Sequence, residues 1–366
     1  MTVPSTLATD ATAPGPAGIS WTDARREHAF AQWLARVAPA HGLRPDTVRL
    51  ASADASFRRY FRVDATLGAA TRIVMDAPPD KENSEPFVKV ADLMAKAGVT
   101  APKVLAWDQA MGFLLLDDLG HQTMLDVIDP ARPEASRPMY DAAVDALVRW
   151  QLSSRPDVLP AYDDALLKRE LALFPDWYVM KHRGVAVEGP LAETLSRTFE
   201  LIVQNNLSAP SVFVHRDFMP RNLMVDPASG ALGVLDFQDA VYGPITYDIA
   251  SLMRDAFLTW EEELVIDVTV RYWEKARKAG LPVDDDFGAF YRAVEWMGLQ
   301  RHLKVAGIFA RLTLRDGKPR YLADTPRFVG YIRSAAARYR ELGPLLRAVD
   351  QIEGIQAAGG YAFGRV

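Results

Sequence analysis

The segment SVFVHRDFMPRNLMVDPASGALGVLDFQDA, residues 211–240, decides how the rest of the chain is interpreted. Within it His215, Arg216 and Asp217 are followed, five positions after the aspartate, by Asn222, which fits the pattern H-R-D-x-x-x-x-N. The segment is a β-like island in a half of the chain that is otherwise predicted to be helical. It also holds most of the side chains that could carry chemistry.

The residues that follow Asn222 predict a hairpin. Residues 223–225 form a short apolar strand, residues 226–230 have the composition of a turn, and residues 231–235 form a return strand that ends at Asp236. A hairpin of this length brings its two ends together, so Asn222 and Asp236 are expected at the same end. An amide oxygen beside a carboxylate suits Mg²⁺, which prefers oxygen ligands.

This arrangement predicts phosphoryl transfer, which depends on positioning and charge neutralisation. Asp236 and Asn222 would hold the metal, and Asp217 would orient the acceptor hydroxyl and take its proton. His215 is predicted to brace the loop. Arg221 either contacts phosphate oxygens or pairs with an acid. The plainer interpretation is a solvated hairpin with acidic turn residues, and the complete set of residues in a strand–turn–strand context argues against it.

The remainder of the chain divides into two parts that differ in their predicted secondary structure. Residues 21–118 mix short strand-like runs with helices and predict an antiparallel sheet with one packed helix, residues 86–96. Residues 119–366 are largely helical, and residues 326–352 are expected to form one helix. Residues 1–20 are rich in Ala, Thr, Pro and Gly and are predicted to be a disordered lead-in. The predicted fold class is therefore α+β.

Two segments of the first half are predicted to bind a nucleotide. The small residues 51–56 would let backbone amides approach phosphates, although an ordinary hairpin loop has the same composition. Residues 112–120 form an apolar strand that ends in acidic residues. In a bilobal kinase such a strand offers backbone groups to adenine, but an ordinary buried strand has the same composition. The predicted nucleotide-binding residues are Ser52, Ala53, Ser56, Leu116, Asp117 and Leu119.

Composition excludes several classes of function. The 366 residues are 49% hydrophobic and contain 42 basic and 47 acidic side chains, a net charge of -5 that gives no reason to expect a nucleic-acid partner. The chain has no cysteine, which excludes disulfides, thiolate metal sites and cysteine nucleophiles. No apolar run approaches the roughly 20 residues that span a bilayer, and no secretory signal is present. A cytoplasmic protein without a membrane partner is expected.

Taken together, these motifs resemble the aminoglycoside phosphotransferase and choline kinase-like family from about Ser52 to Ala256. The resemblance implies a bilobal, protein-kinase-like fold with ATP and Mg²⁺ as cofactors. The segments ADASFRRYFRV, HRDFMPRNLMV and LDFQDAVYGPITYDIASLMRD are most similar to family members that phosphorylate the anomeric C1 hydroxyl of the amino sugars N-acetylmuramate and N-acetylglucosamine in cell-wall recycling. Alternatives are an aminoglycoside, choline or other small hydroxyl acceptor, or a non-catalytic nucleotide-binding scaffold.

The sequence departs from the kinase pattern at one important position. The strand Arg72–Asp76 lacks the usual phosphate-pairing lysine, and the candidates for its replacement are Arg58, Arg59, Arg72, Lys81 and Lys89. Asp236 is followed by Phe-Gln and not Phe-Gly, which favours a constitutive small-molecule enzyme.

Three polar residues in the helical half have two interpretations each. Arg301 and His302 lie in a polar group within an apolar helix and would contact the acceptor, or would belong to a buried ion pair between helices. Asp248, near the start of a helix after a Gly-Pro turn, is predicted to cap that helix and also to anchor the catalytic loop.

Overall fold

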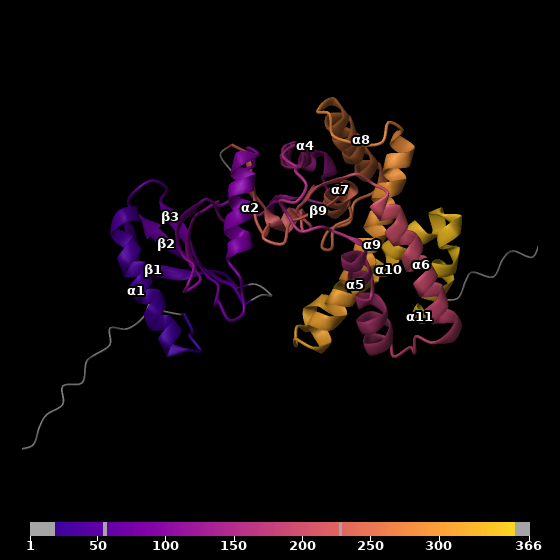
Figure 1. The fold of residues 1–366 in the computed structure, drawn as a ribbon, viewed down its shortest axis with the longest axis horizontal. Helices are drawn as coiled ribbons and strands as arrows, with labels where there is room; N and C mark the ends of the chain where they lie inside the picture. The colour runs from indigo at the N-terminus through magenta and orange to yellow at the C-terminus, as the bar shows by residue number, and fades with distance from the viewer. Residues whose placement is uncertain (1–18, 54–56, 227–228, 356–366) are drawn as a thin grey trace, which may run out of the picture. The chain divides into compact units, whose positions relative to one another are not determined.

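The computed structural model describes residues 19–53, 57–226 and 229–355 (Figure 1). Most of the predicted lead-in, residues 1–18, lies outside this range. The chain divides into two compact units, the first made of Met1–Asp92 and Pro102–Leu119 and the second of Leu93–Ala101 and Gly120–Val366. Among the described helices, none is both long and apolar enough to cross a membrane.

The first unit contains the predicted antiparallel sheet. Its five strands have the order β1-β2-β3-β5-β4, and all neighbours pair antiparallel. The prediction of a small antiparallel sheet is confirmed. The strands are β1 (Leu43–Ala53), β2 (Arg59–Ala65), β3 (Thr71–Asp76), β4 (Val104–Asp108) and β5 (Phe113–Asp117).

Helix α1 (Ala24–His41) builds the core of this unit. Asp23 caps its first turn through a hydrogen bond from the amide of Arg25, and Gly42 ends it in the left-handed conformation. Its buried residues, including Phe30 and Trp33, belong to one hydrophobic cluster with side chains of β1, β2, β3 and β5. Helix α2 (Glu85–Lys96) follows β3, as predicted, and runs from the first unit into the second.

The second unit holds two small antiparallel pairs of strands among helices. β6 (Ser211–Val214) pairs with β9 (Val241–Pro244), and β7 (Leu223–Val225) pairs with β8 (Leu232–Val234). The helices are α3 (Met124–Val127), α4 (Pro133–Leu152), α5 (Asp164–Leu171), α6 (Gly189–Leu207), α7 (Thr246–Met253), α8 (Glu262–Lys278), α9 (Phe287–Leu314), α10 (Thr325–Arg338) and α11 (Gly343–Glu353). A π-helix η1 (Phe174–His182) and the 3₁₀ turns η2 (Pro220–Asn222), η3 (Pro319–Asp324) and η4 (Arg340–Leu342) complete it.

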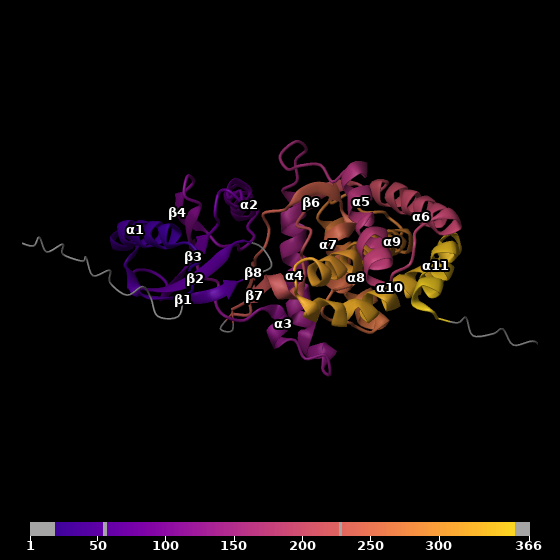
Figure 2. The same cartoon turned by 90° about the horizontal axis from the view of Figure 1, so that it is seen from below.

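Helix α9 is the central helix of this unit (Figure 2). It packs on η1, α10, α7, α6 and α5, and most of its residues from Phe290 to Ala310 are buried. A helix surrounded by others must be apolar on most faces, and the polar side chains that it does bury need partners.

The expected single helix over residues 326–352 is wrong. α10 ends at Arg338, the turn η4 intervenes, and α11 begins at Gly343 with Pro344 in its first turn. Proline cannot donate the backbone hydrogen bond that a continuous helix would require here, whereas it is well accommodated at a helix start.

Candidate active site

The hairpin β7–β8 brings Asn222 and Asp236 together. Leu223 pairs with Val234 and Val225 with Leu232, so the chain enters and leaves at the same end. There Asn222 Nδ2 lies 3.4 Å from Asp236 Oδ2 and donates a second hydrogen bond of 2.9 Å to the carbonyl of Asp217. The NH2 group of Asn222 therefore faces Asp236 here, and its amide oxygen would turn toward Asp236 when both residues hold a metal. The donor set is one amide oxygen and one carboxylate, the oxygen chemistry that Mg²⁺ accepts.

Asp217 lies on the loop between β6 and η2, and its side chain is half-buried. Its backbone carbonyl is held by Asn222, which ties the loop to the hairpin. Among the described residues, no group donates a hydrogen bond to its carboxylate. A half-buried carboxylate without a protein donor is available to an external hydroxyl group.

Two of these loop residues have strained backbones. Arg216 has φ 78° and Asp236 has φ 63°, in the left-handed region that non-glycine residues rarely adopt. Each such residue costs of order 1–3 kcal/mol and persists only where the surrounding structure holds it. Both strained residues are therefore held by contacts elsewhere in the unit.

Asp248 holds the loop from the start of α7. Its carboxylate is fully buried and accepts hydrogen bonds from the amide of His215 at 2.7 Å and from the amide of Arg216 at 3.0 Å. Burial raises the pKa of Asp248 to about 7, although the two amides and Arg301 each act to lower this pKa. The geometry is that of the predicted anchor. The predicted capping of α7 by Asp248 is wrong, because no side chain caps this helix and the carboxylate accepts from the loop amides instead.

The ring of His215 links the loop to the hairpin. Its Nδ1 accepts from the amide of Asp217 at 3.2 Å, and its Nε2 lies 3.0 Å from the carbonyl of Leu235. Because Nδ1 is an acceptor, the proton is on Nε2, which donates to the carbonyl. Burial lowers the pKa of His215 to about 4, so the ring is neutral at pH 7.

A buried ionic cluster lies beneath the loop. Glu170 Oε1 lies 2.6 Å from Arg216 Nη2 and 3.1 Å from Lys304 Nζ, and Glu170 also accepts from Tyr162. Lys304 Nζ donates in addition to the hydroxyl of Tyr247 at 3.1 Å. Burial opposes the charge of Glu170, but Lys304 and Arg216 outweigh it and lower its pKa. The side chain of Arg216 is thus fixed inside the unit.

Sequence reasoning missed two of the residues that shape this site. Glu170 pairs with Arg216 across 46 positions, and no local pattern connects them. Gln238, two residues after Asp236, is buried, and its Nε2 donates to Asp236 Oδ1 at 2.8 Å. This bond fixes the carboxylate of Asp236. The Phe-Gln pair after Asp236 departs from the Phe-Gly pattern, and the amide group of Gln238 is the sequence signal for this bond.

The other residues predicted on the acceptor side are engaged by the protein itself. The guanidinium of Arg221 lies 4.8 Å from the ring centre of Phe257. Arg301 Nη1 donates to the carbonyl of Arg216 at 3.0 Å, and His302 Nε2 lies 3.2 Å from the carbonyl of Arg254. Contact between any of the three and an acceptor stays a prediction.

The predicted nucleotide-binding residues belong to the first unit, which is described by itself. Ser52 and Ala53 end β1, where they pair with Tyr60 and Arg59 of β2. Ser56 lies outside the described residues. Leu116 and Asp117 end β5, and Leu119 is the last residue of this unit. Their contact with a nucleotide stays a prediction.

The candidate phosphate-pairing cations, Lys89 included, interact with other groups of the protein. Arg59 pairs with the buried Asp76 at 2.6 Å, and Arg72 donates to the carbonyls of Thr71 and Leu67. Arg58 forms an ion pair of 3.0 Å with Glu82, and Lys81 lies 4.8 Å from the ring centre of Phe57.

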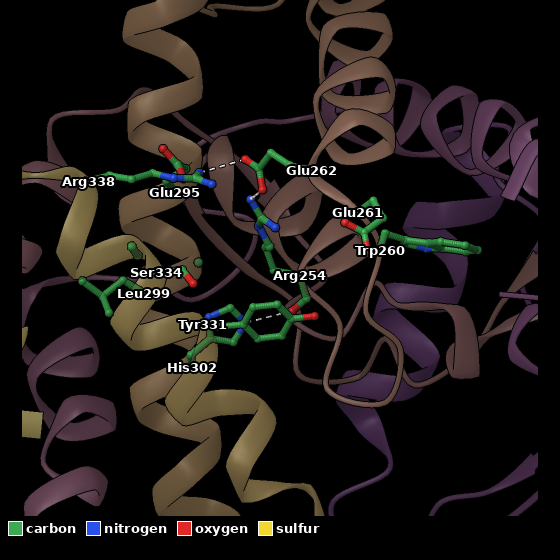
Figure 3. Close-up of a pocket in the computed structure, with 12 residues that line it drawn as sticks. Arg254, Trp260, Glu261, Glu262, Glu295, Leu299, His302, Tyr331, Ser334 and Arg338 are labelled. Carbon is green, nitrogen blue, oxygen red and sulfur yellow. Dashed lines mark hydrogen bonds and ion pairs between the residues drawn. The ribbon is translucent and has the colours of Figure 1, made fainter. Parts of the chain in front are cut away.

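A cavity of about 230 Å³ opens elsewhere in the second unit, between the end of α7, the start of α8, and helices α9 and α10 (Figure 3). Its charged lining is largely paired, with Arg254 on Glu262 at 2.7 Å and Arg338 on Glu262 at 2.8 Å. His302 stacks on Tyr331 with ring centres 4.4 Å apart. Asp217, Asn222 and Asp236 are not among its described lining residues.

Comparisons with known proteins show the family to which the chain belongs. Residues 47–284 match the model of the phosphotransferase enzyme family. The N-acetylmuramate/N-acetylglucosamine kinase of Pseudomonas aeruginosa is 52% identical over 82% of this chain and 88% of its own length. The enzyme with the same name from Neisseria meningitidis is 46% identical over 90% of this chain and 97% of its own length.

Solved structures agree with the fold. An ethanolamine kinase from Plasmodium vivax has a TM-score of 0.59 at 11% identity, covering 91% of this chain and 93% of that one. A choline kinase from Streptococcus pneumoniae has a TM-score of 0.54 at 12% identity, covering 84% and 97%. The predicted protein-kinase-like fold class is confirmed. The chain therefore belongs to the phosphotransferase enzyme family and is an ATP-dependent phosphotransferase that acts on a hydroxyl group.

Proposed function

We propose that this enzyme transfers the γ-phosphoryl group of ATP to the anomeric C1 hydroxyl of N-acetylmuramate and N-acetylglucosamine, and that it acts in cell-wall recycling. The observation that carries the reaction type is the convergence of Asn222 and Asp236 at the backbone of Asp217, whose carboxylate is left available. The choice of sugar is supported by relatives of that name at 46% and 52% identity. Because the co-substrate is ATP, the reaction belongs in the cytoplasm.

Asn222 and Asp236 are proposed to hold Mg²⁺ together with the phosphates of ATP. Within the described residues, no three His, Cys, Asp or Glu side chains form a complete metal site. A magnesium ion bound by one or two protein oxygens and completed by phosphate oxygens agrees with this donor set. Bound metal would neutralise the charge that builds up on the transferred phosphoryl group.

Asp217 is proposed to act on the acceptor. Its carboxylate accepts a hydrogen bond from the sugar hydroxyl, which orients the oxygen toward the phosphorus atom, and it takes the proton as the new P–O bond forms. The bond between the β-bridging oxygen and the γ-phosphorus breaks at the same time, and ADP leaves with the electron pair. The products are ADP and a glycosyl phosphate.

Product analysis by phosphorus NMR tests this proposal. N-acetylglucosamine and N-acetylmuramate, each with Mg·ATP, should give a glycosyl phosphate signal coupled to the anomeric proton. The methyl glycoside of N-acetylglucosamine is the matched control, because it differs only in having its C1 oxygen blocked, and it should stay unphosphorylated. Phosphorylation of the methyl glycoside would show that another hydroxyl accepts the phosphoryl group. Turnover of choline or an aminoglycoside alone would refute the amino-sugar assignment.

A further inference from the structure

We propose that Arg301 is a positioning residue of the phosphotransfer reaction, which holds the peptide group between Arg216 and Asp217 and thereby directs the Asp217 side chain. The inference rests on the proposed function of Asp217. It assigns Arg301 to the protein's own catalytic loop and not to the acceptor.

Arg301 is a buried cation that bonds to a carbonyl group. Its side chain is 2% exposed in the centre of α9, and its Nη1 donates to the carbonyl of Arg216 at 3.0 Å. Among the described residues, no carboxylate lies within ion-pair distance of it, so the expected buried ion pair is made by Lys304 and Glu170 instead. Burying a guanidinium group is costly unless its charge is used. Arg301 also lies 5.0 Å from the ring centre of Tyr247, and its charge acts on Asp217 and Asp248. Both carboxylates belong to the catalytic loop or its anchor, so the positive charge acts on that loop as well as on packing.

The Arg216–Asp217 peptide group is held on both edges. Its carbonyl accepts from Arg301 and lies 3.4 Å from the hydroxyl of Ser251, while its amide donates to His215 Nδ1 at 3.2 Å. The preceding amides of His215 and Arg216 both donate to Asp248. Each amide group from His215 to Asp217 therefore has a defined partner, and the plane of each peptide is fixed.

The strained backbone makes this restraint necessary. Arg216 has φ 78°, and without outside contacts it would relax toward negative φ. Such a relaxation rotates the following peptide group and moves the Asp217 side chain that it carries. Proton transfer and in-line attack tolerate little displacement, so a shift on the order of 1 Å costs about a hundredfold in rate. The charge-assisted bond from Arg301 opposes this relaxation.

The geometry of α9 supplies a matched control. Gln300 precedes Arg301 on the same helix, is fully buried, and donates to the carbonyl of Leu167 at the same 3.0 Å. Its bond leads to α5 and not to the catalytic loop. Arg301→Met and Gln300→Met each remove one buried hydrogen bond to a backbone carbonyl, and they differ in which carbonyl loses its partner.

The experiment measures kcat, the acceptor KM and amide hydrogen exchange in both variants and in Arg301→Lys. Arg301→Met should lower kcat roughly 10- to 100-fold with the acceptor KM within about twofold of wild type. Arg301→Lys, which keeps a cationic donor, should recover part of the loss. Gln300→Met should keep kcat within about threefold at a temperature where it is folded. Exchange of the amides in residues 215–217 should increase only in Arg301→Met.

The remaining outcomes overturn the inference. A raised acceptor KM with unchanged kcat in Arg301→Met would assign Arg301 to the sugar. Equal losses of kcat in both Met variants would show that Arg301 contributes through packing alone. If wild-type enzyme phosphorylates no amino sugar, the proposed function fails, and the exchange measurement still decides the inference. Unchanged protection of residues 215–217 in Arg301→Met would refute it.

Discussion

Replacing Gly307 by alanine tests whether α9 is as closely packed as described. A methyl group at this position would lie 2.3 Å from the carbonyl oxygen of Leu173 and 2.7 Å from its Cβ. Ordinary contacts between such atoms begin at about 3.5 Å, so the overlap is roughly 1 Å. The oxygen belongs to the backbone just before η1, and no side-chain rotation can relieve the overlap. Helix α9 must move away from η1.

The displacement has two calculable consequences. Overpacking of this kind costs about 1–3 kcal/mol of the free energy of unfolding, even though alanine is by itself a better helix former than glycine. Arg301 lies on the same helix, and a shift on the order of 1 Å would lengthen its 3.0 Å bond to Arg216 beyond hydrogen-bonding range. We therefore expect kcat to fall together with stability, by an amount approaching that of Arg301→Met.

The assay is urea unfolding followed by tryptophan fluorescence, together with steady-state kinetics. Gly330→Ala is the matched control, because Gly330 is an exposed helical glycine of α10 with no atom within 4 Å of the added methyl group. It should stabilise the protein by up to about 1 kcal/mol and leave kcat unchanged. If Gly307→Ala unfolds at the same urea concentration as wild type with unchanged kcat, the close approach of α9 to Leu173 is wrong.

Three further predictions concern the site and its surroundings. Asp217→Asn should lower kcat by about 10²- to 10⁴-fold while ATP still binds, and near-normal turnover would contradict its assignment as the base. Asp236→Ala should weaken Mg·ATP binding in a calorimetric titration; the exposed neighbour Asp239→Ala is the control, and equal affinities would argue against a metal ligand at position 236. Burial raises the pKa of Asp255 to about 6, so in the wild type its contribution to stability is lost as pH rises from about 4 through 6. Asp255→Asn should therefore gain about 2 kcal/mol relative to wild type between pH 4 and pH 8 in urea unfolding, and parallel pH profiles would refute this.

The sequence was sufficient for the parts of the site that are local. Asn222 and Asp236 are 14 positions apart in one hairpin, and turn composition together with strand length was enough to predict that they meet. The small antiparallel sheet and the helix α2 were predicted for the same reason, because periodicity and turn residues act over a few positions. The boundary between α10 and α11 is also local, and Pro344 is the residue that marks it in the sequence.

The partners of the buried polar side chains could not be predicted. Arg301 reaches the carbonyl of Arg216 across 85 positions, and Gln300 reaches that of Leu167 across 133. A polar group in an apolar helix indicates only that a partner is needed, since many distant carbonyls have the same chemistry. The π-helix η1 packs against α9, and its residues carry no pattern that distinguishes it from an α-helix.

The strained backbone at Arg216 and Asp236 has a consequence for selecting variants by thermal stability. Asp157 shares the left-handed conformation of Arg216 and Asp236, with φ 62°, but it lies exposed in a loop where no described contact depends on its side chain. Asp157→Gly should raise the free energy of unfolding by about 1 kcal/mol and leave turnover unchanged. Glycine at position 236 would relieve the same kind of strain and remove the carboxylate that the site uses, whereas glycine at position 216 would also break the buried ion pair with Glu170. A mutant library screened for thermal survival alone would therefore drift toward folded proteins without activity, unless turnover is selected in every round.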